Sequence, residues 1–233
     1  MLIIILKLIL FISIGYIIGS IPSAVLISKI FFGFDIRTKG SGNMGSTNAM
    51  RVLGFKWGTI VQVLDILKGA IPVFILADIV APKWDMLSSD SFLNLPILEV
   101  IIGLSAVCGH VWSCFVCFKG GKGVNTTLGM LLVVIPIEGA IGLLIFIITL
   151  LLSGYVSLGS LVAAFFIPII LIIRYNFFNM NIEGYLTLVY LTISFVIIIF
   201  FAHRSNIKRL INGTENKCEK LQLIKKNKKN KNK

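Results

Sequence analysis

The sequence predicts an all-α, polytopic integral membrane protein with about seven transmembrane helices. Its 233 residues are 57% hydrophobic and only 14% charged, and the mean hydropathy is +0.96. Soluble domains are about 45–50% apolar and about 25% charged, so a core surrounded by water cannot account for this surplus of apolar surface. Glycine-rich, polar or basic patches interrupt the apolar runs and mark the helix ends.

A helix needs about 20 apolar residues to cross a bilayer, and fewer where the bilayer thins. The predicted spans cover residues 2–31, 56–80, 95–115, 124–135, 138–153, 158–173 and 184–202. The fourth, fifth and sixth are short and are separated only at Pro136 and at Gly154–Tyr155, so merging two of them is an alternative. The first run lacks an early basic cluster and continues into a polar motif, which indicates a retained helix and not a signal peptide.

Smaller features within the spans bear on helix packing. Gly15 and Gly19 lie one turn apart, as close helix contact requires, and Pro22 and Pro72 are expected to kink their helices. In the second span, Asp65 and Lys68 share one helix face and are expected to pair, either structurally or for function.

The positive charges are concentrated near the C-terminal end of the sequence. Residues 203–233 hold eleven of the 22 Lys and Arg residues and only two of the ten acidic ones. The positive-inside rule places this end in the cytoplasm, and seven spans then place the N-terminus outside. We predict one membrane domain over residues 1–210 and a basic tail without fixed structure over 211–233. The tail is expected to attract anionic membrane lipids and not nucleic acid.

Four patches carry the candidate chemistry, and the predicted topology places all of them on the cytoplasmic side. They cover residues 40–51, 110–123, 157–160 and 203–210. Glycine beside Ser, Asn, Lys and Arg lets backbone N–H groups and cations surround a phosphate. GSGNMG at 40–45 matches a dinucleotide pattern only in its letters, because it joins two membrane spans. KGGKG at 119–123 lacks the Ser or Thr of a phosphate-binding P-loop.

The first two patches therefore predict two anion sites. In the first, the glycines bend the backbone, small polar side chains add neutral donors and Arg51 adds a bidentate cation. The second has two lysines on a glycine turn that opens a helix. The predicted phosphate-binding residues of these two patches are Gly40, Gly42, Asn43, Gly45, Thr47, Asn48, Arg51, Lys119, Gly120, Gly121, Lys122 and Gly123.

The two histidines, His110 and His203, both adjoin these patches. Histidine is suited to proton transfer near neutral pH, and neighbouring cations favour neutral His203. We hypothesise that His203 orients or deprotonates an attacking hydroxyl. Cys114 and Cys117 have no second Cys or His pair at zinc spacing, so neither a metal nor another cofactor is predicted.

The motifs GSIPSA, DIRTKGSGNMGSTNAMRVLG, GHVWSCFVCFKGGKGV, SLGS and HRSNIKRLINGTE resemble, in this order, those of the bacterial acyl-phosphate:glycerol-3-phosphate acyltransferase family. The resemblance covers about residues 19–215. It implies a multi-pass enzyme of the bacterial inner membrane with a cytoplasmic active site. The implied reaction moves an acyl group from acyl phosphate to the sn-1 hydroxyl of glycerol 3-phosphate and gives lysophosphatidic acid.

By the same resemblance, the expected catalytic residues are Ser41, His203 and Asn206. The resemblance also adds Ser157 and Ser160 of the third patch to the predicted phosphate-binding residues. A soluble enzyme that makes acyl phosphate is an implied partner. A His-x4-Asp dyad is disfavoured because Phe115 and Lys208 stand where the Asp would be. The alternative from another class is a transporter or flippase for an organic phosphate, although the two halves show no repeat of the glycine motifs.

Overall fold

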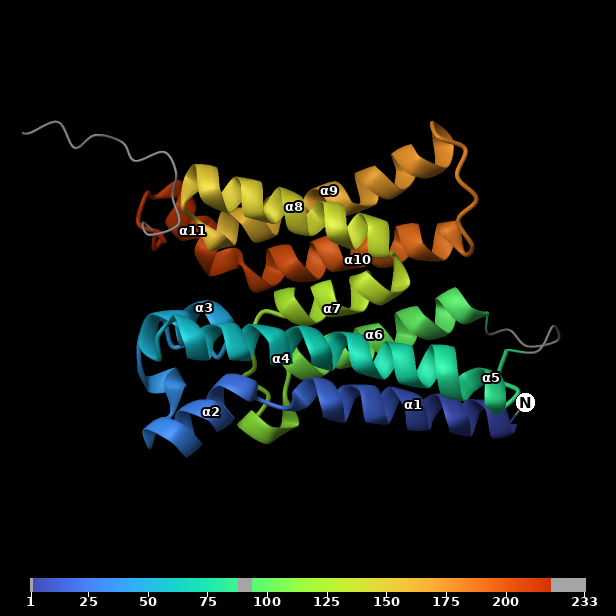
Figure 1. Ribbon diagram of the computed structural model, residues 1–233, viewed down its shortest axis with the longest axis horizontal. Helices are drawn as coiled ribbons and strands as arrows, with labels where there is room; N and C mark the ends of the chain where they lie inside the picture. The colour runs from blue at the N-terminus through green and yellow to red at the C-terminus, as the bar shows by residue number, and fades with distance from the viewer. Residues whose placement is uncertain (1, 88–93, 219–233) are drawn as a thin grey trace, which may run out of the picture.

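The computed structural model describes residues 2–87 and 94–218, and its helices run along one long axis (Figure 1). Within these residues six helical segments are long and apolar enough to cross a membrane, and a shorter apolar helix, α7 (Val124–Val134), lies beside them. The prediction of an all-α bundle with about seven apolar helices is thereby confirmed.

The first predicted span is two helices. α1 (Leu2–Ser20) ends before Ile21, and α2 (Ser23–Phe32) begins after Pro22. Proline lacks a backbone N–H and disfavours helical geometry in the residue before it, so the helix breaks where the sequence analysis expected a kink. α2 is left as a separate short helix at one end of the bundle (Figure 1).

The second span is longer than predicted. α4 (Phe55–Val73) continues through a π-helical stretch, η2 (Phe74–Val80), into the short α5 (Ala81–Lys83). The third span is α6 (Leu95–Val111), followed by the 3-10 turn η3 (Cys114–Val116).

Glycines set the spacing between these helices. A Cβ on Gly19 of α1 would lie 2.0 Å from the carbonyl oxygen of Ala106 on α6. A Cβ on Gly69 of α4 would lie 2.0 Å from the carbonyl oxygen of Thr126 on α7. Only glycine allows backbones to approach this closely, as the sequence predicted for Gly19.

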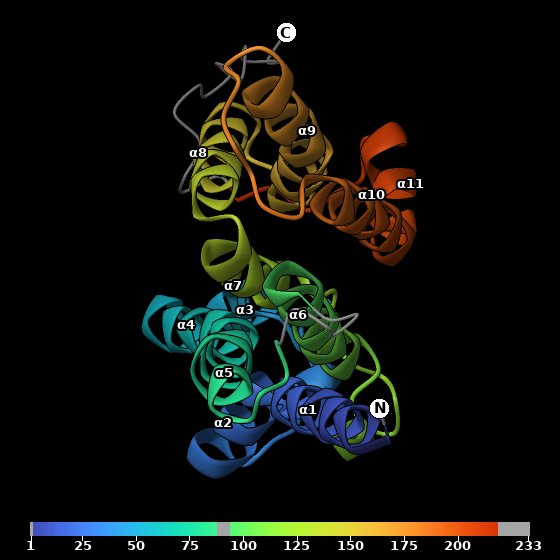
Figure 2. The same cartoon turned by 90° about the vertical axis from the view of Figure 1, so that its right-hand side faces the viewer.

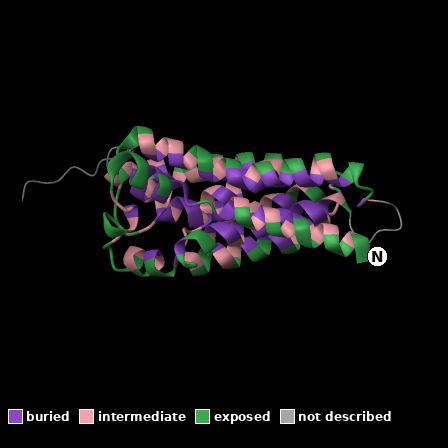
Figure 3. Cartoon of the chain, turned by 90° about the horizontal axis from the view of Figure 1, so that it is seen from below, coloured by how far each residue is buried: buried purple, intermediate pink, exposed green. Residues whose placement is uncertain are grey.

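The remaining helices form a second group. α8 (Pro136–Ser153), α9 (Val156–Asn176) and α10 (Tyr185–Ala202) pack together and face the group of α1, α4, α6 and α7, with α7 leading from one group to the other (Figure 2). A core cluster that includes Phe11, Ile102, Met130, Leu171 and Phe195 spans both groups. The exposed residues lie on the outward faces of the helices (Figure 3), and many of them are Leu, Ile and Phe, which suits lipid contact.

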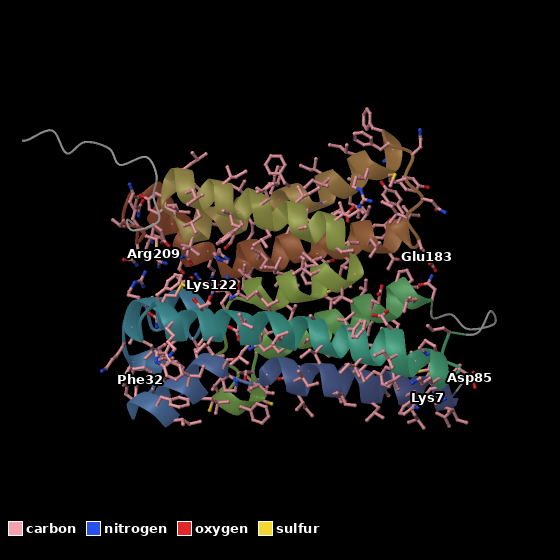
Figure 4. The ribbon with its side chains drawn as sticks, in the orientation of Figure 1. Lys7, Phe32, Asp85, Lys122, Glu183 and Arg209 are labelled. Atoms are coloured by element: carbon pink, nitrogen blue, oxygen red, sulfur yellow. The ribbon has the colours of Figure 1, made fainter. Side chains whose placement is uncertain are left out.

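The polar patches gather at one end of the bundle. The region 32–55, predicted as a loop, contains the 3-10 turn η1 (Ile36–Thr38) and helix α3 (Ser46–Val52). The chain returns to this end in α11 (Arg204–Ile211). Lys122 and Arg209 lie at this end, whereas Lys7, Asp85 and Glu183 lie at the other (Figure 4).

The predicted tail begins at residue 211, but the chain stays against the bundle until Cys218, whose N–H donates to the carbonyl of Gly154 at 2.8 Å. The rest of that tail lies outside the described residues.

Candidate active site

Asn48 holds the first glycine loop in shape. Its side-chain Nδ2 donates to the backbone carbonyls of Asn43 at 2.9 Å, Lys39 at 3.1 Å and Ile36 at 3.4 Å, and its Oδ1 accepts the Ser41 N–H at 2.8 Å. These contacts occupy the whole amide group, which is buried. Asn48 therefore contributes to the site by fixing the backbone of the loop.

Two glycines make this loop possible. Gly40 and Gly42 have φ angles of 63° and 72°, which are left-handed conformations that glycine adopts without strain. Asn43 then caps the next bend by accepting the Gly45 N–H at 2.9 Å. Ser41 and Arg51 remain exposed at the rim, and Thr47 is half-buried.

The second patch lies against the first. Asn125, at the start of α7, donates from Nδ2 to the Ser46 Oγ at 2.9 Å. This contact joins the N-terminal turns of α3 and α7, so both predicted anion-binding loops belong to one surface.

The two lysines of the glycine turn serve different parts of this surface. Lys119 lines a cavity of about 420 Å³, together with Asp35, Arg37, Thr38, Gly42, Asn43 and Gly120. Arg37 forms an ion pair with Asp35 at 2.7 Å, and its hydrogen bonds lower the pKa of Asp35 to about 2. Lys122 lies on the other side of the turn, where its Nζ donates to Asn206 Oδ1 on α11.

Glu215, which lies outside the four predicted patches, joins the third patch to the fourth. Its Oε1 accepts from Asn206 Nδ2 at 2.6 Å and from Ser157 Oγ at 3.0 Å, and its Oε2 accepts from Arg209 Nε at 2.7 Å. Burial alone would raise the pKa of Glu215, but these hydrogen bonds outweigh it and lower that pKa. A single carboxylate among the cations of 203–217 was the signal available in the sequence.

The electrostatics around Lys122 follow from burial. Burial lowers its pKa to about 8, and the positive charge of Arg209 adds to the shift, whereas Glu215 opposes it. Burial, and then the nearby charge of Lys122, likewise lower the pKa of His203 to about 4. His203 is therefore neutral near pH 7, as its cationic neighbours predicted.

The proton on His203 can be assigned from its partner. Nδ1 lies 2.9 Å from the carbonyl oxygen of Ile199, and because a carbonyl only accepts, Nδ1 carries the proton. Nε2 then holds a lone pair and can accept a proton from a hydroxyl.

Hydrogen bonds thus connect Lys122, Asn206, Glu215 and Ser157. His203 lies close enough to Lys122 for the lysine charge to lower the pKa of the imidazole. Ser160 is buried, and its hydroxyl donates to the carbonyl of Val156 within α9. Among the residues that the structure describes, no hydrogen bond joins Ser41 or the Arg51 side chain to this network.

Three comparisons with known proteins agree. Residues 9–213 match the model of the family described as glycerol-3-phosphate acyltransferase. The glycerol-3-phosphate acyltransferase of Fusobacterium nucleatum subsp. nucleatum is 44% identical over 89% of this chain and 96% of its own length. That of Chlorobium phaeobacteroides strain BS1 is 40% identical over 91% of this chain and 97% of its own length.

Solved structures show the same fold. The glycerol 3-phosphate form of PlsY (YgiH), an integral membrane glycerol 3-phosphate acyltransferase, has a TM-score of 0.75 and 34% identity and covers 90% of this chain and 94% of its own. The lysophosphatidic acid form has a TM-score of 0.73 and 33% identity, with the same coverage.

Proposed function

This chain belongs to the PlsY-type glycerol-3-phosphate acyltransferase family, and we propose that its four polar patches form the site where acyl phosphate and glycerol 3-phosphate react. Membership makes the chain a membrane-integral enzyme that acylates glycerol 3-phosphate to lysophosphatidic acid, not the transporter considered as the alternative. The proposal concerns the donor, the roles of the residues and the side of the membrane.

The observation that carries the proposal is the Lys122–Asn206–Glu215–Ser157 network beside neutral His203, at the polar end of an apolar bundle. A phosphate needs cations and neutral donors, and a fatty chain needs an apolar surface next to them. The arrangement supplies both. It fits two phosphate-bearing substrates better than a thioester donor, which has no phosphate at the reacting carbonyl.

In the proposed reaction, the sn-1 hydroxyl oxygen attacks the carbonyl carbon of acyl phosphate, and a new C–O ester bond forms. The hydroxyl proton passes to His203 Nε2 or to the phosphate of the donor. The bond between the carbonyl carbon and the phosphate oxygen then breaks, and inorganic phosphate leaves with the bonding electrons. Acyl phosphate is an activated mixed anhydride, so alignment and charge stabilisation suffice and no acyl-enzyme is needed.

Each patch has a proposed task. Lys122 and Asn206 stabilise the charge of the leaving phosphate, and Ser41 and Arg51 complete the site from the opposite rim. Asn48 fixes the backbone of the first loop. The remaining predicted residues surround the substrate phosphates: Gly40, Gly42, Asn43, Gly45 and Thr47 of the first loop, Lys119, Gly120, Gly121 and Gly123 of the glycine turn, and Ser157 and Ser160 of α9.

The donor is tested with purified protein in detergent. Acyl phosphate, acyl-CoA and acyl carrier protein are offered separately with labelled glycerol 3-phosphate, and lysophosphatidic acid is measured. We expect product from acyl phosphate alone. Equal rates with a thioester donor would refute the donor assignment while leaving the acyltransferase activity in place.

We also propose that the enzyme resides in the bacterial cytoplasmic membrane with this end facing the cytoplasm. The basic segment after His203 supports this orientation through the positive-inside rule. A soluble enzyme that supplies acyl phosphate is a proposed partner, because an activated anhydride hydrolyses in water and benefits from direct delivery.

A further inference from the structure

A buried polar cluster lies behind the glycine turn, inside the apolar body. It comprises Ser23 of α2, Asp65 and Lys68 of α4, and His110 of α6, each 5% exposed or less. Lys68 Nζ lies 2.8 Å from Asp65 Oδ1, and Ser23 Oγ donates to the same oxygen at 3.0 Å. Charges at such a depth are costly and are usually kept for a specific task.

The cluster also contacts the break in the first span. Lys68 Nζ donates to the carbonyl oxygen of Ile21 at 2.9 Å, between the end of α1 and the start of α2. The break at Pro22 leaves a helix end whose backbone groups need partners, and Lys68 provides one. One ion pair on α4 therefore holds the break between α1 and α2 and the first residue of α2.

His110 lies between this cluster and the glycine turn and contacts both. Its Nδ1 lies 3.9 Å from Asp65 Oδ1, and its backbone carbonyl accepts the Gly121 N–H at 3.0 Å. The adjoining carbonyl of Val111 accepts the Gly120 N–H, also at 3.0 Å. A Cβ on Gly121 would lie 2.1 Å from His110 Nε2, so the ring packs directly on the turn backbone. The ring thus fills the space between Asp65 and the turn.

The helix that follows the turn, α7, packs on α4, the helix that carries Asp65 and Lys68. Gly69 follows Lys68 on α4 and lies against the backbone of Thr126 in the first turn of α7. The near end of the Lys119–Gly123 turn is therefore held by backbone hydrogen bonds to α6, and the helix that follows the turn packs on α4 next to Lys68.

We propose that the Ser23–Asp65–Lys68–His110 cluster positions the glycine turn, so that Asp65 and His110 are positioning residues for phosphate binding by Lys119 and Lys122. The inference rests on the proposed function, which assigns this turn to the substrate phosphates. The cluster does not touch the substrate. It sets where the turn backbone, and with it the two ammonium groups of Lys119 and Lys122, are placed.

A matched control separates positioning from ordinary stabilisation. Glu138 of α8 is 1% exposed and is paired with Arg174 of α9, at the end of the bundle away from the glycine turn. Glu138→Gln and Asp65→Asn each replace one buried, paired carboxylate by its isosteric amide. Both substitutions are expected to destabilise the fold, but only Asp65→Asn is expected to change the position of the glycine turn.

The experiment measures two quantities in detergent-purified protein: amide hydrogen exchange of peptides covering the Lys119–Gly123 turn, and KM and kcat for glycerol 3-phosphate. For Asp65→Asn we expect faster exchange in the turn, a KM raised about tenfold through the displacement of Lys119, and a lowered kcat through the displacement of Lys122, which acts on the leaving phosphate. For Glu138→Gln we expect both to match the unmodified enzyme. Ser23→Ala, which removes one hydrogen bond to Asp65, should act in the same direction more weakly and serves if Asp65→Asn does not fold.

Unchanged exchange in the turn with a KM within about twofold for Asp65→Asn or Ser23→Ala would overturn the proposal. An equal effect of Glu138→Gln would overturn it as well, since that result indicates general loosening. Hydrogen exchange can be measured whether or not the protein is catalytically active. If Lys122→Met keeps full activity, the proposed function fails, while exchange in Asp65→Asn still decides whether the cluster holds the turn.

Discussion

At the residue scale, the site depends on side chains whose charge is set by burial. Burial favours the neutral form of both Lys122 and His203. The lowered pKa of Lys122, about 8, still lies above pH 7, whereas the lowered pKa of His203, about 4, lies below it. Near pH 7 this leaves a charged lysine beside an uncharged imidazole, which is the combination that a phosphate leaving group and a hydroxyl proton require.

The first prediction concerns Lys122 and pH. A lysine is charged below its pKa, so with a pKa of about 8 the ammonium is lost as the pH rises through that value. We expect kcat/KM to fall above about pH 8, and Lys122→Arg to remove that fall because arginine stays charged. Initial rates from pH 6 to 10 measure this. A flat profile for the unmodified enzyme would contradict the role of Lys122.

The second prediction distinguishes the two proton acceptors. If His203 Nε2 takes the hydroxyl proton, His203→Ala should lower kcat by about a hundredfold or more, because general base catalysis has that magnitude. His203→Gln retains a polar group of similar reach but no base, so it should lose about as much. Rates within a few-fold of the unmodified enzyme for both variants would assign the proton to the donor phosphate.

At the element scale, the polar loops are rigid because they satisfy their own hydrogen bonds. Asn48 alone makes four hydrogen bonds, which tie the first loop to itself and to Ile36 and Lys39, and α3 and α7 are joined through Ser46 and Asn125. The loop backbone is therefore fixed before a substrate binds, as an anion site requires.

The third prediction tests this loop. Asn48→Ala leaves buried backbone groups without partners, which should reduce stability by about 1–3 kcal/mol and raise KM for glycerol 3-phosphate. Thermal unfolding and steady-state kinetics measure the two effects. Asn48→Asp is the comparison variant: it keeps the acceptor for the Ser41 N–H, but its second carboxylate oxygen cannot donate and faces three carbonyl oxygens, so we expect a KM raised at least as much as in Asn48→Ala. An unchanged KM in Asn48→Ala would show that the loop does not bind substrate.

At the scale of the whole molecule, the site forms where the two helix groups meet. Lys122 follows α6, whereas Asn206, Ser157 and Glu215 come from α11, α9 and the segment after α11. The Lys122–Asn206 contact joins residues 84 positions apart. The site therefore exists only when both groups are packed.

The fourth prediction follows from the position of the polar patches. In a cysteine-free background, Arg51→Cys and Lys119→Cys should react with an impermeant thiol reagent only from the cytoplasmic side. Lys83→Cys and Asp85→Cys, at the other end of the bundle, should react only from outside. Labelling of intact cells and of inside-out vesicles measures both. Reaction of Arg51→Cys and Lys119→Cys from opposite faces would rule out a common site.

Several features could be read from the sequence alone, because they depend on composition and local spacing. The apolar surplus indicated the membrane helices, Gly19 indicated a close helix contact, and the ordered glycine motifs indicated phosphate chemistry. Hydrophobicity and backbone freedom are properties of single residues and short segments, so a linear pattern reveals them.

Other features appear only in three dimensions. At Pro22 the sequence predicts only a kink, and the structure decides that α2 is a separate helix. The contacts of Asn48 depend on how its own loop folds, and the separation of Lys119 from Lys122 and the role of Glu215 depend on which distant segments meet. The pairing of Asp65 with Lys68 follows from helix spacing, but its link to the glycine turn through His110 requires the packing of α4 against α6. Hydrogen bonds and burial are properties of pairs and of surroundings, so only the folded chain decides them.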